Sequence, residues 1–321
     1  MKKSALVLFC VAIAMFLPFR ELYSEEATAS FAGHTIRVDG SIGDWIGTAP
    51  SKPNTAVVDK GEYIWKDETG DDKGNGKYTY PTNKIFAKGA DLLEFRVTWD
   101  SQNVYFLIKR ARPGDWWVPY CLIGIDEDGA RGMKKGAQIL AQGDINSLEA
   151  DIGAFGELKV MPALACEYAI GISGTYKGRI WDSDGKLIAK TLGGQNDTKG
   201  FLVKDSSWSA VEVAIPQSII GNPAGKTWRF IVATGLEEDG RLREIYKEAT
   251  EWHGGGGEAT TAEDGVDPDF YDLAGSDKAT QESELGSYNA SSPAGDTNGF
   301  SVIKKSYLPV TFSAMKLASL N

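Results

Sequence analysis

The chain has 321 residues, of which 42% are hydrophobic and 24% are charged, and its 34 basic and 44 acidic residues give a net charge of -10 at pH 7. Such an acidic surface repels phosphate backbones and anionic membranes, so nucleic acid and anionic bilayers are poor partners. The length allows one large β domain or two smaller ones.

The N-terminus predicts a secretory signal. Lys2 and Lys3 precede an apolar run at 5–17, which is followed by polar residues. This pattern is typical of an export signal, and the run is shorter than the roughly 20 residues that span a bilayer. Cleavage after Ser24 or Ala29 fits. We assign 1–24 as the signal peptide and 25–32 as a spacer, so the mature protein is expected to be secreted, periplasmic or on the cell surface, with no membrane span.

Alternation of apolar and polar residues predicts β-strands along the rest of the chain. In 93–100 every second residue is apolar, and a Ser-Gln-Asn turn leads into a second alternating run at 104–109. This pattern predicts a hairpin with one buried face. The mostly apolar run 227–236 predicts a strand buried on both faces. Further strands are expected at 34–38, 56–59, 118–125, 158–161, 167–172, 179–182, 187–191, 208–216 and 307–312, with one helical turn at 217–220.

The predicted fold class is all-β, an antiparallel β-sandwich of the immunoglobulin-like or jelly-roll-like kind with long surface loops. No internal repeat and no proline-rich linker divides the chain, so we expect a single domain over 33–315. The segment 252–298 combines glycines, acidic residues and a Ser/Asn-rich stretch. It is predicted to be a long loop excursion within this domain, with a short helix at 277–285.

The loop that begins at Asp67 carries the residue types of a cation site. Asp67, Asp71 and Asp72 lie within six residues, and nearby glycines allow the backbone to turn back and present carbonyl oxygens. Calcium takes six to eight oxygen ligands, and such a loop can supply several of them. The order of the acids is not that of an EF-hand. Two interpretations remain, a calcium site and a solvated acidic turn.

Aromatic residues are the candidates for ligand contact. Nine tryptophans and twelve tyrosines are many for this length, and sugar rings stack on aromatic planes while nearby polar groups bind their hydroxyls. Two adjacent tryptophans in the loop at 113–117 cannot easily both point inward. The predicted carbohydrate-binding residues are Trp116, Trp117, Tyr63, Trp65 and Trp252. For Trp116 and Trp117 the alternative is that their side chains pack to anchor the loop, and Trp99, Trp208 and Trp228 are expected in the core.

Two cysteines, Cys121 and Cys166, remain after removal of the signal. In an exported protein two cysteines permit one disulfide. Both lie within predicted strands, so a bridge requires neighbouring or facing strands. Two buried thiols that behave as small apolar side chains are the alternative.

Catalytic motifs are absent from the sequence. The only histidines are His34 and His253, and there is no Gly-x-Ser-x-Gly elbow, His-Glu-x-x-His motif or phosphate-binding glycine loop. A glycosidase needs two carboxylates about 5–10 Å apart, and the sequence alone does not select such a pair from 44 acids. The sequence therefore predicts a protein that is not an enzyme.

Several motifs resemble one known family. They are Val-Asp-Gly at 38–40 with Asp-Trp at 44–45, Gly-Asp-Asp-Lys-Gly at 70–74 with Tyr-Thr-Tyr-Pro-Thr at 78–82, and Glu-Trp-His-Gly-Gly-Gly at 251–256. They are similar to the C-terminal, non-catalytic domain of glucodextranase and amylopullulanase-type enzymes, which is related to DOMON domains and family-nine carbohydrate-binding modules. The resemblance implies a DOMON-type sandwich, attachment to a glycan or cell surface, and bound calcium. In those enzymes the domain accompanies a catalytic domain that acts on α-glucans.

The leading hypothesis is an exported, calcium-stabilised module that binds a poly- or oligosaccharide, such as an α-glucan or a cell-envelope glycan, with a glycosidase or transporter supplied in trans. One alternative is a haem b-binding electron-transfer subunit, because a DOMON relative holds haem between Met, His or Lys side chains. The available ligands for haem are Met133, Met161, His34 and His253. A second alternative is a surface-layer protein that binds copies of itself.

Overall fold

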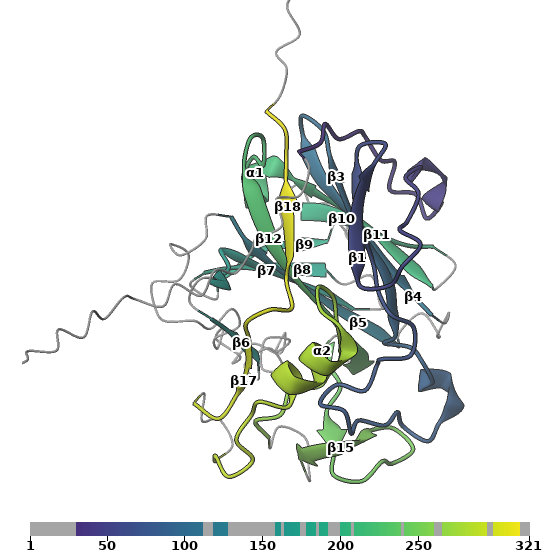
Figure 1. Cartoon of the computed structure of the whole chain (residues 1–321), viewed down its shortest axis with the longest axis vertical. Coiled ribbons are helices and arrows are strands. Elements are labelled where there is room, and N and C mark those ends of the chain that lie inside the picture. Colours follow the sequence, from purple (N-terminus) through teal and green to yellow (C-terminus); the bar gives the residue numbers. More distant parts are fainter. Residues whose placement is uncertain are drawn as a thin grey trace, which may run out of the picture.

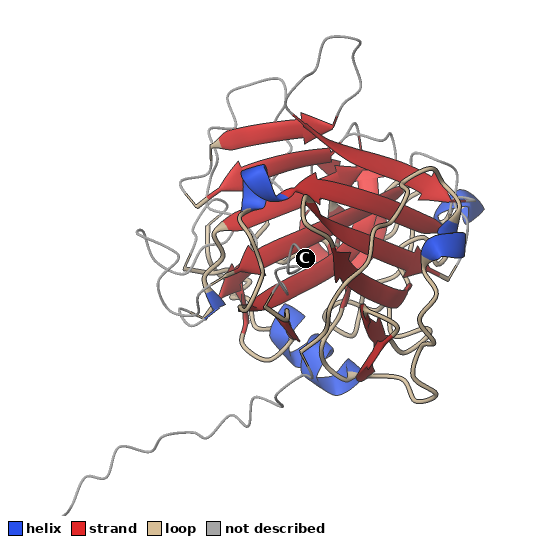
Figure 2. Ribbon diagram, turned by 90° about the horizontal axis from the view of Figure 1, so that it is seen from above, coloured by secondary structure: helices blue, strands red, loops and turns tan. Residues whose placement is uncertain are grey.

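A computed structural model describes residues 30–111, 118–127, 158–161, 164–173, 178–183, 186–191, 200–206, 209–238, 241–259, 265–293 and 298–314. The predicted signal peptide at 1–24 lies outside the described residues, as do Trp116, Trp117, Met133 and Trp208. Strands are the predominant regular elements of the described part, and the helices are short (Figure 2).

In this part of the chain, five antiparallel strands form a first layer in the order β1-β2-β3-β4-β11. Their bounds are β1 Thr55–Asp59, β2 Glu62–Lys66, β3 Leu92–Trp99, β4 Asn103–Arg110 and β11 Ala210–Pro216. The predicted hairpin is β3–β4, in which Phe95 pairs with Ile108 and Val97 pairs with Phe106. The register shifts between Leu92 and Glu94, at the end of β3 where the acidic loop enters.

The second layer runs in the order β9-β8-β7-β5-β12, and β16 and β18 both pair with the free edge of β12. β10 joins the layers, because it pairs antiparallel with β11 and parallel with β9 (Figure 1). The bounds are β5 Pro119–Asp126, β7 Tyr168–Ser173, β8 Gly178–Asp182, β9 Leu187–Thr191, β10 Gly200–Ser206, β12 Thr227–Glu238, β16 Phe270–Leu273 and β18 Leu308–Thr311. The protein is a β-sandwich, as the alternating sequence pattern predicts.

Short elements complete the described fold. β14 pairs with β15 and β17 pairs with β6, both in parallel, and β13 extends from the end of β12. The bounds are β6 Leu158–Val160, β13 Arg241–Leu242, β14 Ile245–Tyr246, β15 Gly254–Ala259, β17 Ser301–Ile303, α1 Gln217–Ile220, α2 Lys278–Leu285 and the 3-10 turns η1 Ile42–Asp44 and η2 Lys84–Phe86. α1 is the helical turn predicted after Pro216, and α2 is the predicted short helix, capped by Asp277.

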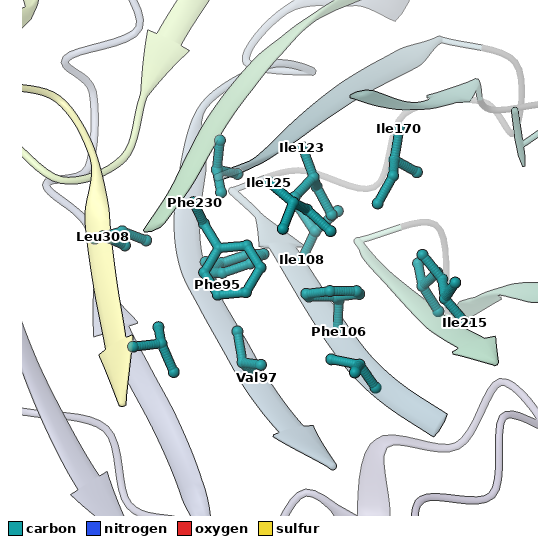
Figure 3. Close-up of a cluster of buried hydrophobic side chains, with 14 of the residues drawn as sticks. Phe95, Val97, Phe106, Ile108, Ile123, Ile125, Ile170, Ile215, Phe230 and Leu308 are labelled. Atoms are coloured by element: carbon teal, nitrogen blue, oxygen red, sulfur yellow. The ribbon is translucent and has the colours of Figure 1, made fainter. Parts of the chain in front are cut away.

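Apolar side chains of both layers fill the space between them. Phe106 of β4 meets Phe230 of β12 with the ring centroids 5.6 Å apart, and Phe95 lies 5.9 Å from the same ring. The cluster also contains Val97, Ile108, Ile123, Ile125, Ile170, Ile215 and Leu308 (Figure 3). Burying each such side chain contributes about 1.5–3 kcal/mol, so this core is the main source of stability.

The outer face of the first layer is also buried, which differs from the prediction of a single buried face. Glu94 and Arg96 alternate with core residues along β3, yet they are only 5% and 7% exposed. Arg96 donates hydrogen bonds to Glu62 and Glu94 at 2.8 and 2.6 Å and to the Gly47 carbonyl at 2.8 Å. Buried charge is tolerated here because it is paired and hydrogen-bonded.

The segment 33–48 covers this outer face. Glu212 of β11 accepts hydrogen bonds from the Gly40 amide at 2.8 Å and from the Trp45 indole at 3.0 Å. Ile36 and Trp45 pack against Tyr105 and Leu107. The Val-Asp-Gly and Asp-Trp motifs therefore attach this segment to the sheet. The strand predicted at 34–38 does not form, because its groups bond to side chains rather than to a neighbouring strand.

The segment 252–298 is integrated into the fold rather than being a surface excursion, because it contains β15, β16 and α2. Its glycine run at 254–257 passes close to the backbone of Ala249 and to the backbone of Lys77. A Cβ at Gly255 would lie 2.5 Å from the Ala249 amide nitrogen, and one at Gly256 would meet the Lys77 carbonyl, where φ is also +93°. Only glycine fits such close backbone approaches.

Cys121 and Cys166 are buried and are not joined by a disulfide. Cys121 packs in the core between the layers, whereas Cys166 packs with Leu122 and Ile231 on the opposite face of the second layer. The disulfide interpretation does not fit this arrangement, and the interpretation of two buried thiols does.

Candidate metal centre

Three buried aspartates converge at the end of the sandwich where α2 lies (Figure 1). Asp67 directly follows β2, Asp71 lies in the loop that follows, and Asp272 belongs to β16. One carboxylate oxygen from each lies within 4.8 Å of the other two. Two oxygens on opposite sides of a calcium ion, each about 2.4 Å from it, are about 4.8 Å apart, so this spacing suits a single ion.

Asp67 is positioned by the end of the first layer. Its amide donates to the Leu93 carbonyl at 3.0 Å, which continues the contact between β2 and β3. The Trp65 indole donates to its Oδ1 at 2.9 Å. Its other oxygen, Oδ2, is buried without a hydrogen-bond partner. One oxygen therefore orients the carboxylate and the other stays available for a cation.

The loop after Asp67 turns at Gly70, where φ is +87° and the amide donates to Asp91 Oδ1 at 3.0 Å. The Asp71 carbonyl then accepts from the Lys73 amide at 2.6 Å and from Gln281 Nε2 of α2 at 2.8 Å. These bonds fix the Asp71 backbone, while its side-chain Oδ1 is buried and has no partner.

Asp272 connects both layers to the cluster. It pairs with Thr234 across β12 and β16, and its Oδ2 accepts from the Leu92 amide at the start of β3 at 2.8 Å. Its Oδ1 accepts from the Leu273 amide at 2.9 Å. The residue is fully buried. Each carboxylate oxygen still has lone-pair capacity, because an ionised carboxylate has about four acceptor sites.

Two further acids border the triad. Asp72 and Asp91 are 3% and 0% exposed, and the Oδ2 of each is buried without a partner. Asp72 lies near the Tyr80 hydroxyl, which accepts from the Ala90 amide at 3.1 Å. Within the described ranges, none of the five aspartates forms a salt bridge with Lys, Arg or His.

Burial and mutual repulsion favour neutralisation of the negative charge on these carboxylates. Burial, reinforced by the neighbouring carboxylates, raises the pKa of Asp71 to about 7 and the pKa of Asp91 to about 6. Burial and the neighbouring aspartates likewise raise the pKa of Asp67 and the pKa of Asp272 well above their ordinary range. Desolvation disfavours the charged form, and like charges disfavour each other. The cluster therefore holds either protons or a cation.

A second acidic group nearby is satisfied by the protein itself. Asp267 accepts hydrogen bonds from the Tyr78 hydroxyl at 3.0 Å and from the Glu258 amide at 3.2 Å. Asp269 accepts from the Ile245 amide at 2.6 Å. These acids hold β14, β15 and the acidic loop together. In contrast, the triad has carboxylate oxygens with no protein partner.

The structure brings together two of the three predicted metal residues, Asp67 and Asp71, and adds Asp272. Asp72 is buried beside them but faces Tyr80. The sequence analysis missed Asp272 because it lies some two hundred residues further along the chain and reaches the cluster through strand pairing. A signal for it exists, since Asp272 is a single acid within the otherwise apolar strand Phe270–Leu273.

The predicted aromatic residues fall into three groups. Tyr63 and Trp65 are 1% and 7% exposed and belong to the core, so their rings present no face to a glycan. That expectation is corrected, because on β2 both residues are covered. Trp252 is 45% exposed. Trp116 and Trp117 lie outside the described residues.

The possible haem ligands occupy separate surroundings. His34 Nε2 lies 3.2 Å from the Asp44 carbonyl and 3.7 Å from Glu62, on the outer face of the first layer. His253 stacks on Tyr246 with the ring centroids 4.1 Å apart. Met161 packs at the edge of a third group, the cluster on the far face of the second layer. The described residues therefore do not bring these side chains together.

Among the described residues, no helix has the length and apolar character needed to cross a membrane.

Residues 63–297 match the family described as the C-terminal binding module, SLH-like, of glucodextranase. No curated protein matches the chain. The matched range contains the whole acidic cluster and most of both layers. The chain therefore belongs to the family of glucodextranase C-terminal, SLH-like binding modules.

Proposed function

We propose that the protein is an exported, non-catalytic module that is stabilised by calcium and binds a glycan outside the cytoplasm. The observation that carries the proposal is the cluster of Asp67, Asp71 and Asp272, with buried oxygens that no protein group satisfies. Family membership supports the binding role, because the family is described as a binding module.

The donor chemistry of the cluster fits calcium. All the side-chain donors are carboxylate oxygens, which are hard ligands, and no imidazole or thiolate is among them. Calcium accepts six to eight oxygens in flexible geometry, whereas magnesium demands a near-ideal octahedron and keeps several waters. Asp67, Asp71 and Asp272 would hold the ion, and its charge would neutralise carboxylates that otherwise repel one another.

The glycan role rests on the family and on aromatic side chains. Trp252 is exposed, and Trp116 and Trp117 are further candidates for contact with a glycan. The structure describes Ala111 and Val118, which flank them in the sequence. Ala111 donates to the Asp91 carbonyl, and the Val118 carbonyl accepts from Glu237. Ala111 and Val118 therefore lie at the same end of the sandwich as the acidic cluster. An α-glucan or a cell-envelope glycan is the proposed ligand, with a glycosidase or transporter as partner in trans.

Export is proposed from the sequence. Lys2 and Lys3, followed by the apolar run 5–17, form a secretory signal. Calcium sites of extracellular modules typically have dissociation constants of about 10⁻⁴–10⁻³ M, so such a site is filled only where calcium is as abundant as it is outside the cell. Mass analysis of the protein recovered from the culture medium or periplasm tests the expectation of cleavage after Ser24 or Ala29.

Native gel electrophoresis in gels that contain a polysaccharide tests the glycan role. The mature protein, run with calcium, is expected to migrate more slowly in at least one gel from a panel of α-glucans, β-glucans and peptidoglycan fragments. A protein of similar size and charge that binds no glycan is the control for sieving. Unchanged mobility in every gel would contradict the proposal.

A further inference from the structure

Trp252 is exceptional among the tryptophans that the structure describes. Its side chain is 45% exposed, whereas Trp45, Trp65, Trp99, Trp181 and Trp228 are all buried. A turn presents it: the Thr250 hydroxyl accepts from the amides of Trp252 and His253 at 3.2 and 2.9 Å. These backbone hydrogen bonds fix the turn that presents the indole at the surface, although tryptophan side chains are usually largely buried.

The indole also contacts a buried aromatic ring. Its ring meets the buried ring of Phe86 edge-on, with the centroids 6.0 Å apart and the planes at 84°. The guanidinium of Arg243 lies over the same Phe86 ring at 4.9 Å and donates to the Trp252 carbonyl at 3.1 Å. Contacts that favour one orientation of the ring before binding lower the conformational entropy that is lost when a ligand covers it.

Polar side chains are linked to the backbone of Trp252 through Arg243. Glu238 Oε1 accepts from Arg243 at 3.2 Å, and Glu238 Oε2 lies 3.4 Å from Nε2 of His253. His253 in turn stacks on Tyr246 with an interplanar angle of 11°. The side chains of Glu238 and His253 are 26% and 18% exposed, so both reach solvent. The turn therefore groups an exposed indole, a carboxylate and an imidazole in one region of the surface, a combination that offers stacking together with hydrogen bonds to hydroxyls.

We propose that Trp252, Glu238 and His253 form a binding site for a pyranose ring of an uncharged glycan. The inference rests on the proposed function and names its site and ligand class. The C–H face of the sugar stacks on the indole, and its hydroxyls hydrogen-bond to Glu238 and His253. Uronic acids and sulfated sugars are disfavoured, because Glu238 lies at the site and the chain carries a net charge of -10.

The test compares binding of soluble glycans by isothermal titration. Dextran and maltooligosaccharides serve as neutral probes, and polygalacturonate serves as the anionic probe. Relative to wild type, Trp252→Ala is expected to weaken binding of the neutral probe by about tenfold or more, and Trp252→Tyr, which keeps an aromatic face, by less. Ile46→Ala removes an equally exposed apolar side chain elsewhere and is expected to change nothing.

Three outcomes would overturn the proposal at different levels. If wild type binds a neutral glycan and Trp252→Ala binds it equally well, the site lies elsewhere while the proposed function stands. If polygalacturonate binds more tightly than the neutral probes, the ligand class is wrong. If wild type binds no glycan from these or from the wider panel, the proposed function fails and this site fails with it. Circular dichroism of each variant verifies that the fold is intact.

Discussion

At the scale of single residues, the acidic cluster is defined by oxygens without partners. Asp71 is the best position for a test, because its side-chain Oδ1 has no hydrogen-bond partner and its backbone makes the structural contacts. Asp71→Asn removes one negative charge and little else. We expect calcium affinity to fall about tenfold or more, which corresponds to about 1.4 kcal/mol.

Without calcium, Asp71→Asn is expected to be at least as stable as wild type, because it relieves repulsion among buried carboxylates. Thermal unfolding with and without calcium measures both effects. Glu248→Gln, a substitution at an exposed acid, is the matched control and should leave both melting temperatures unchanged. A variant that keeps the full calcium-induced rise in Tm would show that Asp71 is not a ligand.

Residues also show where sequence reasoning succeeded and where it did not. Asp67 and Asp71 are recognisable because ligands of one loop are close in sequence. Asp272 is not, because its position depends on the pairing of β16 with β12. Tyr63 and Trp65 adjoin the same acidic loop, but the sequence does not reveal that β2 is covered on both faces. Exposure of an aromatic ring depends on tertiary packing, which spacing along the chain does not encode.

At the scale of elements, α2 holds the metal loop against the second layer. Gln281 donates from Nε2 to the Asp71 carbonyl at 2.8 Å, and its Oε1 accepts from the Leu273 amide at 2.7 Å. The Gln281 side chain thus joins the backbone of Asp71, a proposed ligand, to the backbone of Leu273, which follows the proposed ligand Asp272. The helix begins at Asp277, whose carboxylate accepts from the Thr280 amide at 2.8 Å and so caps the N-terminus.

Gln281→Ala is expected to destabilise the protein by about 1–3 kcal/mol, because it removes two buried hydrogen bonds, one to the Asp71 carbonyl and one from the Leu273 amide. It should also weaken calcium binding, since the Asp71 loop loses its contact with α2. Lys278→Ala, at the exposed start of the same helix, is the control and should change stability by less than about 0.5 kcal/mol. Urea unfolding and calcium titration of both variants measure these effects, and equal losses in the two variants would argue against this role of Gln281.

The loop at 67–91 links the two proposed sites. Its first part carries the acids, and its second part pairs with the segment that presents Trp252. The Thr82 amide donates to the Thr250 carbonyl at 2.8 Å, and the Asn83 amide donates to the Glu251 carbonyl at 3.3 Å. Tyr80 stacks on Tyr271, one residue before Asp272, at 4.6 Å. A well-ordered acidic cluster therefore helps to hold the turn that presents Trp252 in place.

At the scale of the whole molecule, the strands follow the sequence closely. The hairpin at 93–109, the doubly buried β12 and the final β18 are predictable because alternation and continuous apolar runs depend on local sequence. The covered outer face of the first layer is not predictable, because Glu94 and Arg96 look like solvent-facing residues until Glu62 and the segment 33–48 are placed. The glycine run of β15 lies in a segment that the sequence predicts to be a loop. It forms a strand against packing partners that include Lys77 and Tyr78, which are distant in the sequence.

The stability of the calcium-free protein is expected to depend on pH through the acidic cluster. Burial and the neighbouring carboxylates raise the pKa of Asp71 to about 7 and the pKa of Asp91 to about 6, whereas unfolded aspartate titrates near 3.9. Between about pH 4 and pH 7 the folded state therefore holds more protons than the unfolded state. The free energy of unfolding then falls as pH rises through this window.

Urea unfolding of calcium-free protein at about pH 5 and about pH 7.5 measures this fall, and added calcium should reverse it at the higher pH by binding only the folded state. Asp71→Asn should show a shallower pH dependence. Stability that rises over the same interval without calcium would mean that these carboxylates are paired in solution by groups other than a cation.

Calorimetric titration of calcium into the calcium-free mature protein tests the central claim most directly. Repeating the titration in two neutral buffers of different ionisation enthalpy counts the protons released. The account predicts one bound calcium per chain, with protons displaced from the aspartates as the ion binds, and binding that is about tenfold or more weaker in Asp71→Asn. Absence of calcium binding to the wild-type protein, or binding of the same strength in Asp71→Asn, would contradict it.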